Sequence, residues 1–507
     1  MADWATTATT TSGEPPITNL RVRAARGTII NSAFQIGLAV LSLLRQLAVA
    51  AFLTQEEFGL WGILLAILTT LVWLKQIGIA DKYIQQSDSD QELAFQKAFT
   101  LELAVSFGYF VFSCMVLPLF ALAYGHTEII LPGFLLATSV ILTAFQTPAW
   151  IHYRRLNYGR QRLLTSVDPV VSIFGMVALA GAGFGYWGLV IGGVVGSFTG
   201  AIVCIATSPY RMRIRFDMQT LREYASFSWP LLGLSLSRLV VIQGSLLIAT
   251  RSVGLAAVGA LGLAASYATF SDKVNAIVSQ TIYPAICRVA DRKEALQEVF
   301  LKSNRVALMW GITFGVGLAL FSGDLVNFLL GDKWEDAINL LAAYGVICGL
   351  GQLAVNWTIF MRAVNRTKPL FAAALLDVAV FVFVLAPCVL TLGVTGYVIG
   401  FATAMLVQIL ARTYFMRTLI DGFNLARHTW RAIAPVLVPI ALILAIRQVA
   451  GGDRTPARAV GELALYVAAT AAFTYFLERR LITELVGYMR GRGRPAPGPS
   501  GEARALA

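Results

Sequence analysis

Apolar runs of about 20 residues recur along the chain from Gly27 to Leu477, separated by short polar segments. A helix of that length spans the roughly 30 Å of hydrocarbon in a bilayer. The pattern therefore predicts an all-α, polytopic membrane protein with about fourteen transmembrane helices. We expect these spans at 27–52, 58–79, 95–122, 129–150, 164–183, 186–207, 227–250, 255–283, 304–322, 337–360, 370–391, 393–416, 433–449 and 458–477.

A sequence repeat divides most of these spans into two blocks. GYWGLVIG at 185–192 and GVTGYVIG at 393–400 share the pattern G-x-x-G-x-V-I-G at an offset of 208 residues, and an offset of 200 aligns Gly59 with Gly259. The matches occupy the same places in spans 1–6 and 7–12. We predict two similar six-helix lobes, related by a two-fold axis along the membrane normal. The glycines are expected to let neighbouring helices approach closely.

The predicted organisation has two lobes, a linker, an accessory helix pair and two tails. Both tails are basic, cytoplasmic and expected to be disordered, because they lack the apolar residues that a core requires. The longest external loop, 322–337, has room for no more than a surface helix, so no folded domain is expected outside the membrane. In chain order, the segments are the first tail (1–26), the N-lobe (27–207), the linker (208–226), the C-lobe (227–416), the accessory helices (417–477) and the second tail (478–507).

Composition and charge support this organisation. Charged residues make up 13% of the chain, against about 25% in soluble proteins. The net charge of +12 is unevenly placed, because most of the 40 Lys and Arg lie in the tails and in one alternate set of loops. Such an asymmetry places both termini in the cytoplasm and argues against a nucleic-acid partner. Only five cations fall on the opposite side: Arg251, Lys333, Arg447, Arg454 and Arg458.

Several sequence features argue against catalysis. The five cysteines have no metal-like spacing, and neither a phosphate-binding G-x-x-x-x-G-K-[ST] loop nor an H-E-x-x-H motif occurs. No Ser/His/Asp constellation stands out. We expect a protein that is not an enzyme, with no cofactor and no metal.

Four cations are predicted inside the membrane, on corresponding helices of the two lobes: Arg45 and Arg238 on the first, Lys75 and Lys273 on the second. A buried Arg is costly in a bilayer, so it is expected to face protein or a water-filled cavity. The four would suit an anionic substrate such as a phosphorylated lipid headgroup. The alternatives are an ion pair for Arg45 and snorkelling to the cytoplasmic interface for Lys75 and Lys273.

Four carboxylates are also predicted within the membrane: Glu102, Asp168, Asp272 and Asp377. Asp168 and Asp377 are placed at the start of spans 5 and 11, where each would cap a helix N-terminus or pair with a nearby Arg. The alternative is a functional role, as a site for H⁺ or Na⁺ coupling or as a gate that closes on the cations.

A family resemblance rests on residues 53–86, LTQEEFGLWGILLAILTTLVWLKQIGIADKYIQQ. This stretch resembles the N-terminal signature of the polysaccharide transport branch of the MOP (multidrug/oligosaccharidyl-lipid/polysaccharide) flippase superfamily. Further resemblances are RMRIRFDMQTLREYASFSWPL at 211–231 and FLLGDKWEDA at 328–337. The sequence departs from the family pattern where Gln55 replaces the usual Pro and Ala51 stands where many members have Arg, which leaves the subfamily open.

The resemblance implies a flippase similar to the Wzx type, and related to the lipid II flippase and the MATE (multidrug and toxic compound extrusion) exporters. Such proteins move undecaprenyl-pyrophosphate-linked oligosaccharides from the inner to the outer leaflet of the bacterial cytoplasmic membrane, for exopolysaccharide, O-antigen or capsule synthesis. By this resemblance, Arg45 and Arg238 would line the cavity, and spans 13–14 (433–477) would lie near the lipid tail. A polysaccharide polymerase is an expected partner, and a monomer the expected state.

Three other functions stay open. A drug or organic-cation antiporter of the same superfamily would be expected to carry carboxylates and aromatic residues in its cavity, rather than excess Arg and Lys. A membrane-embedded glycan polymerase or ligase would be expected to need a larger external loop than 322–337. The third is a flippase for lipid II itself, which the sequence alone distinguishes poorly from an oligosaccharide flippase. The glycan and the coupling ion are not specified by the sequence.

Overall fold

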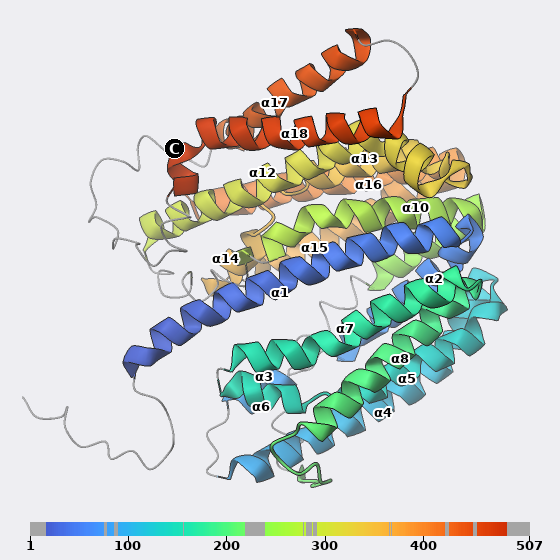
Figure 1. Cartoon of the computed structure of the whole chain (residues 1–507), viewed down its shortest axis with the longest axis vertical. Helices are drawn as coiled ribbons and strands as arrows, with labels where there is room; N and C mark the ends of the chain where they lie inside the picture. Colours follow the sequence, from blue (N-terminus) through green and yellow to red (C-terminus); the bar gives the residue numbers. More distant parts are fainter. Residues whose placement is uncertain are drawn as a thin grey trace, which may run out of the picture.

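The regular elements of the structure are helices. The computed structural model describes residues 17–75, 79–85, 90–155, 157–218, 239–276, 278–279, 286, 292–364, 366, 368–420, 425–449 and 454–483, and no strand occurs among them (Figure 1). Nine helical segments in this described part are long and apolar enough to cross a membrane. The predicted all-α polytopic fold is confirmed. The count of fourteen stays a prediction, because Lys368–Arg417 is one continuous helical segment that contains two of the predicted spans.

The first half of the chain forms long helices joined by short turns. Thr54 and Glu57 make a capping box before the second helix: the backbone N–H of Thr54 donates to Glu57 Oε2 at 2.9 Å, and that of Glu57 donates to Thr54 Oγ1 at 3.2 Å. Gly125, with a φ of 84°, ends the long fourth helix. The elements are α1 (Ile17–Phe52), α2 (Gln55–Lys75), α3 (Ile79–Gln85), α4 (Gln91–Tyr124), η1 (Thr127–Ile129), α5 (Ile130–Ala144), α6 (Pro148–Arg154), α7 (Tyr158–Gly181) and α8 (Gly185–Ala206).

The second half repeats this order of elements. Gly331 follows its long helix with the same φ of 84° as Gly125, and α14 takes the place of α6. Two accessory helices, α17 (Leu425–Val449) and α18 (Pro456–Leu477), complete the chain. The elements of the second half are a helix at Leu239–Val253, α10 (Leu255–Ala268), η2 (Thr269–Asp272), α12 (Lys293–Leu325), η3 (Val326–Leu330), η4 (Asp332–Trp334), α13 (Ala337–Leu350), α14 (Trp357–Ala363), α15 (Lys368–Val380), η5 (Phe381–Leu385) and α16 (Ala386–Arg417).

The repeated glycine pattern does the same work in both halves. Gly185 and Gly393 have positive φ values of 55° and 60°, which only glycine adopts readily, and each begins a helix or a helical segment after a bend. One turn later, a Cβ added at Gly188 would lie 2.9 Å from a backbone nitrogen of α7, and one added at Gly396 would lie 1.9 Å from a backbone oxygen. The expected close approach of helices is confirmed.

The predicted capping role of Asp168 and Asp377 is wrong. α7 begins at Tyr158, with Asn157 as its N-cap, and α15 begins at Lys368. Asp168 and Asp377 therefore lie nearly three turns inside their helices and cap neither one. In α7 the error arises because the polar first turns, YGRQR, lie outside the apolar run that the hydropathy pattern detects, although they belong to the same helix. The start of α15 lies within two residues of the predicted one, and Asp377 is nine residues further along.

The loop 322–337 holds two short helices and packs partly into the protein. α12 continues to Leu325, and η3 and η4 carry the chain back into the core, where Trp334 is completely buried. This segment belongs to the interface described below.

The helices run roughly side by side between two ends of the molecule (Figure 1). We call the end where α1 stops and α2, α10 and α18 begin the distal end, and the opposite end the proximal end. We call α1–α8 the N-lobe and Leu239–Val253 through α16 the C-lobe. The accessory pair α17–α18 packs on the C-lobe along α12.

Candidate functional site

The lobes meet at the distal end through the first turns of α2 and α10. A Cβ added at Gly59 would lie 2.5 Å from the carbonyl oxygen of Leu255, and one added at Gly259 would lie 2.0 Å from that of Gln55. The two contacts exchange under the offset of 200 residues, because 55 and 59 correspond to 255 and 259. Reciprocal contacts of this kind arise when a two-fold axis relates two similar units.

The end of α1 is held by the segment after η3. The ammonium group of Lys333 donates to the carbonyl oxygens of Ala51 and Leu53 at 2.7 and 2.8 Å, and the indole N–H of Trp334 donates to that of Ala50 at 2.9 Å. The amide of Gln55 donates in turn to the carbonyl of Lys333. A cation suits this place, because the last carbonyls of a helix carry partial negative charge. Partial burial lowers the pKa of Lys333, and the nearby Glu57 carboxylate raises it.

A second cation makes the same kind of contact elsewhere on the distal face. Arg251, near the end of the Leu239–Val253 helix, donates through Nε to the carbonyl of Ala123 at 2.7 Å and through Nη2 to that of Leu122 at 2.9 Å. These are the last carbonyls of α4. In both contacts the C-lobe supplies the cation and the N-lobe supplies the helix end.

A buried polar network joins the lobes behind these contacts. Gln243 of the C-lobe is 5% exposed and donates to Ala66 O at 3.0 Å and to Thr70 Oγ1 at 2.8 Å. It also accepts a 2.7 Å hydrogen bond from the hydroxyl of Tyr124. Gln243 thus contacts both α2 and α4, and both ends of its carboxamide are satisfied.

The hydrophobic clusters differ between the two ends. The largest cluster draws on both lobes at the distal end, where Phe58 packs edge-to-face on Trp334 at a centroid distance of 5.5 Å. At the proximal end, one cluster around Phe95 contains only N-lobe residues, and another around Phe300 contains only C-lobe residues. Within the described residues, the lobes therefore share a core distally and keep separate cores proximally.

Of the four predicted cations, the structure describes the side chains of Arg45 and Lys273. Arg45 is half-buried on α1, and its Nη1 lies 3.3 Å from the sulfur of Met176 on α7. Lys273 is exposed, with its Nζ 5.5 Å from the ring centroid of Phe270. Arg238 and the side chain of Lys75 lie outside the described residues. The binding role of all four stays a prediction.

The N-lobe carboxylate Asp168 has neutral partners. Gln146 donates to its Oδ2 at 2.8 Å, and the hydroxyls of Ser172 and Ser197 donate to its two oxygens at 3.1 Å. These donors come from beyond α5, from α7 and from α8, so the Asp168 carboxylate links three parts of the N-lobe. Glu102 lies half-buried on α4.

The C-lobe carboxylates have related but different partners. Gln408 donates to Asp377 at 2.6 Å, and Gln352 donates to Asp272 at 2.5 Å. Arg412, one turn beyond Gln408 on α16, donates to the carbonyl of Gly351 at 2.9 Å. One guanidinium thus lies near both carboxylates. Sequence reasoning missed Arg412, although the i, i+4 spacing of Gln408 and Arg412 places both on one helix face.

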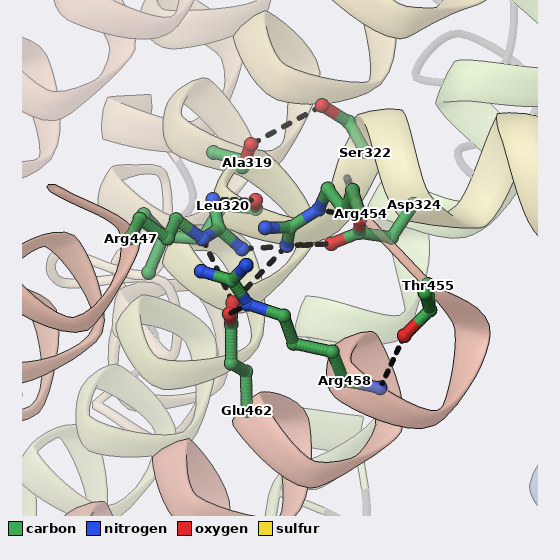
Figure 2. A network of polar contacts seen from close by, with 9 residues as sticks. All are labelled: Ala319, Leu320, Ser322, Asp324, Arg447, Arg454, Thr455, Arg458 and Glu462. Carbon is green, nitrogen blue, oxygen red and sulfur yellow. Dashed lines mark hydrogen bonds and ion pairs between the residues drawn. The ribbon is translucent and has the colours of Figure 1, made fainter. Parts of the chain in front are cut away.

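A network of ion pairs fixes the accessory helices to the distal end of the C-lobe. Figure 2 shows three arginines around two carboxylates: Arg454 pairs with Asp324, Arg447 pairs with Glu462 at 2.9 Å, and Arg458 pairs with Glu462 at 3.1 Å. Asp324 and Glu462 are buried. The hydrogen bond from Arg454 to Asp324 raises the pKa of this arginine, and burial opposes that effect. Sequence reasoning missed both carboxylates, although the spacing of Arg458 and Glu462 on one helix was a usable signal.

Comparison with known proteins gives a family and related folds. A sequence profile of the family described as "Polysaccharide biosynthesis protein" matches residues 48–339, more than half of the chain. The chain is 22% identical over 335 residues to the succinoglycan biosynthesis transport protein ExoT of Rhizobium meliloti (strain 1021), covering 64% of this chain and 66% of that protein. It is 23% identical over 350 residues to the lipopolysaccharide biosynthesis protein WzxC of Escherichia coli (strain K12), covering 66% and 67%. The chain thus matches about two thirds of the length of these relatives.

The fold is similar to that of a solved transporter. The lipid II flippase MurJ, in an inward closed conformation, superposes with a TM-score of 0.71 over 90% of this chain and 100% of that chain. Their sequences are 13% identical, so this similarity shows a shared fold.

Proposed function

The chain belongs to the polysaccharide biosynthesis protein family, and from this membership we propose that it is a flippase for a polyprenyl-pyrophosphate-linked oligosaccharide. It moves this lipid from the inner to the outer leaflet of the bacterial cytoplasmic membrane. The relatives named for succinoglycan transport and lipopolysaccharide biosynthesis support this substrate class. The observation that carries the proposal is the reciprocal contact of the two lobes through Gly59 and Gly259, because two related lobes around one axis suit alternating access.

In the proposed mechanism, the distal face lies on the external side of the cytoplasmic membrane, and both termini lie in the cytoplasm. The headgroup enters between the lobes from the proximal side, while the polyprenyl tail stays in the bilayer. Arg45, Lys75, Arg238 and Lys273 hold the pyrophosphate, since cations bind its oxygens through charge-assisted hydrogen bonds. The lobes then rock apart at the distal end, which requires the contacts of Lys333, Arg251 and Gln243 to break. None of these steps is catalytic, and none requires a bound cofactor.

The direction of transport requires an energy source, because moving a lipid between leaflets is nearly neutral in free energy. We assign this role to an H⁺ or Na⁺ gradient. Asp272 and Asp377 are the first candidates for the coupling site, because they share the neighbourhood of Arg412 and carry one negative charge in excess of it. Asp168 and Glu102 are the second candidates.

The lipid pool of cells that lack this protein tests the proposal. We expect polyprenyl-pyrophosphate oligosaccharide to accumulate, detected by mass spectrometry, and to stay inaccessible to a glycan-modifying enzyme added outside. An unchanged lipid pool, under conditions where the surface glycan is made and no second flippase is expressed, would overturn the proposal and favour an antiporter of the same superfamily.

A further inference from the structure

An extended segment after α8 lies along the proximal edge of the N-lobe. Its sequence at 211–218, RMRIRFDM, alternates arginine with apolar residues over its first six positions. Ile214, Phe216 and Met218 are 71%, 61% and 62% exposed. Arg211, Arg213 and Arg215 are exposed as well.

Polar contacts to the first turns of α4 hold this segment in place. The backbone N–H of Arg211 donates to Glu92 at 3.2 Å, and that of Arg215 donates to the hydroxyl of Thr100 at 2.7 Å. The ammonium group of Lys97 pairs with Asp217 at 2.8 Å. The exposure of the apolar side chains is therefore built into a segment with a fixed path.

Residues 211–217 belong to no helix. Their contacts follow α4 in chain order, from Glu92 and Gln96 at Arg211 to Thr100 at Arg215. The segment therefore runs along the first turns of α4. Alternate side chains of an extended segment point to opposite sides. The sequence alternates in this way: arginine occupies positions 211, 213 and 215, and the positions between and beside them carry Tyr210, Met212, Ile214 and Phe216.

The first apolar residues of the segment pack on the protein, and the later ones are exposed. Tyr210 and Met212 pack on the proximal cluster of the N-lobe, and Arg155 lies over the Tyr210 ring at 5.2 Å. Ile214 and Phe216, next in the same row, have no such cover and are exposed. A row of this kind requires an apolar surface outside the described protein.

The length of α4 places this row near the surface of the bilayer. α4 has 34 residues, or about 51 Å at 1.5 Å per residue, and the hydrocarbon core is about 30 Å thick. Its distal end coincides with the distal end of the bundle, so its first turns extend beyond the hydrocarbon on the proximal side. Figure 1 places the start of α4 and the segment after α8 together at the outer edge of the N-lobe, away from the C-lobe.

We propose that residues 211–218 form a binding site for anionic phospholipids of the proximal leaflet. Ile214, Phe216 and Met218 enter the boundary between headgroups and acyl chains, and the arginines contact the lipid phosphates. The charge of the segment favours this ligand. The segment contains three arginines and one aspartate, and that aspartate is paired with Lys97. Exposed cations near a membrane attract anionic headgroups. This site does not depend on the flippase proposal, since it lies at the outer edge of one lobe.

Photo-crosslinking tests this site directly. The full chain carries p-benzoylphenylalanine in place of Phe216 and is placed in nanodiscs of phosphatidylcholine with and without phosphatidylglycerol. We expect lipid adducts at this position, with phosphatidylglycerol enriched over its share of the bilayer. Each arginine near the surface contributes about 1 kcal/mol to the attraction of anionic lipid, which is about fivefold in binding. The double variant R213Q/R215Q should therefore lower the enrichment of phosphatidylglycerol by about fivefold for each arginine removed. Both arginines are exposed, and an unchanged gel-filtration profile confirms that the variant folds.

A matched control separates this site from general contact with lipid. The same photoreactive residue in place of Phe198, an exposed residue within α8, should react with both lipids in proportion to their abundance. Equal enrichment at positions 198 and 216, or no lipid adduct at 216, would overturn the proposal. Crosslinking of position 216 to a protein in whole cells, in place of lipid, would overturn it in favour of a docking surface for that protein.

Discussion

At the scale of single residues, each of the few cations at the distal end has a defined partner. Arg251 and Lys333 bind the last carbonyls of N-lobe helices, and the other three bind buried carboxylates. In the proposed orientation, the positive-inside rule disfavours cations at this end. All five that occur there bind a helix end or a carboxylate.

Removing the Lys333 ammonium should loosen the distal closure. Lys333→Met takes a charged donor from two carbonyls at the end of α1, and such hydrogen bonds contribute about 1.5–3 kcal/mol when shielded from water. Because this side chain is exposed, we expect the closed state to lose about 1 kcal/mol of stability relative to the open state. This corresponds to roughly a fivefold rise in the fraction of open molecules. The reactivity of a cysteine at Gln55 toward a membrane-impermeant maleimide measures this fraction. Lys302→Met, which removes a surface pair with Glu298, is the control, and equal reactivity in both variants would contradict the role of Lys333.

Gln243 should stabilise the contact between the lobes through hydrogen bonding. Gln243→Leu keeps a side chain of similar size and leaves the hydroxyls of Thr70 and Tyr124 without this partner. We expect a loss of about 1–3 kcal/mol in the free energy of unfolding. A double-mutant cycle with Thr70→Val should show a coupling above about 0.5 kcal/mol, and additive effects would refute the interaction.

At the scale of elements, α2 and α10 cross closely because each carries a glycine where the other begins. Gly59→Ala or Gly259→Ala would force a Cβ into backbone, so each should destabilise the closed interface by about 1–3 kcal/mol. Gly62→Ala and Gly262→Ala, one turn along the same helices, meet open space or ordinary contact and should stabilise by up to about 1 kcal/mol. Thermal unfolding of the four variants measures this difference, and a loss of stability in all four would contradict it.

The sequence predicts elements and their repetition better than contacts between them. The glycine pattern at 185–192 and 393–400 identified close helix packing correctly, because such packing depends on local residue size. The start of α7 was misplaced by six residues, since hydropathy does not detect the polar first turns of a helix. The burial of Trp334 was missed, because it depends on α1 reaching the same place from nearly 300 residues away. The partners of Asp272 and Asp377 were missed for the same reason.

At the scale of the molecule, the accessory pair α17–α18 is fixed to the C-lobe and should move with it. Beyond the arginine network, the Tyr466 hydroxyl donates to Thr313 O at 2.9 Å, and Arg305 pairs with Glu478 at 3.6 Å. The contacts run along α12 from the distal toward the proximal end. Rocking of the lobes would therefore carry α17 and α18 without separating them from α12.

Glu462→Gln should weaken this attachment. Three arginines would then surround one carboxylate, and breaking a buried ion pair costs about 3–5 kcal/mol. The arginines are partly exposed, so we expect about 2–3 kcal/mol, with faster proteolysis between α16 and α17 as the local readout. Glu298→Gln, in an exposed pair with Lys302, is the control and should change stability by less than about 0.5 kcal/mol. Equal proteolysis of the two variants would contradict the attachment.

The measurement that tests the account most directly is lipid translocation by a protein whose distal end can be locked. Cysteines replace Gln55 and Lys333 in a background without other cysteines, and a short, cleavable thiol reagent bridges them in proteoliposomes that contain a polyprenyl-pyrophosphate oligosaccharide. The account predicts that bridging stops the movement of this lipid between leaflets and that a reductant restores it, whereas each single-cysteine variant keeps moving lipid after the same treatment. Continued translocation with the bridge intact would contradict alternating access through the distal interface.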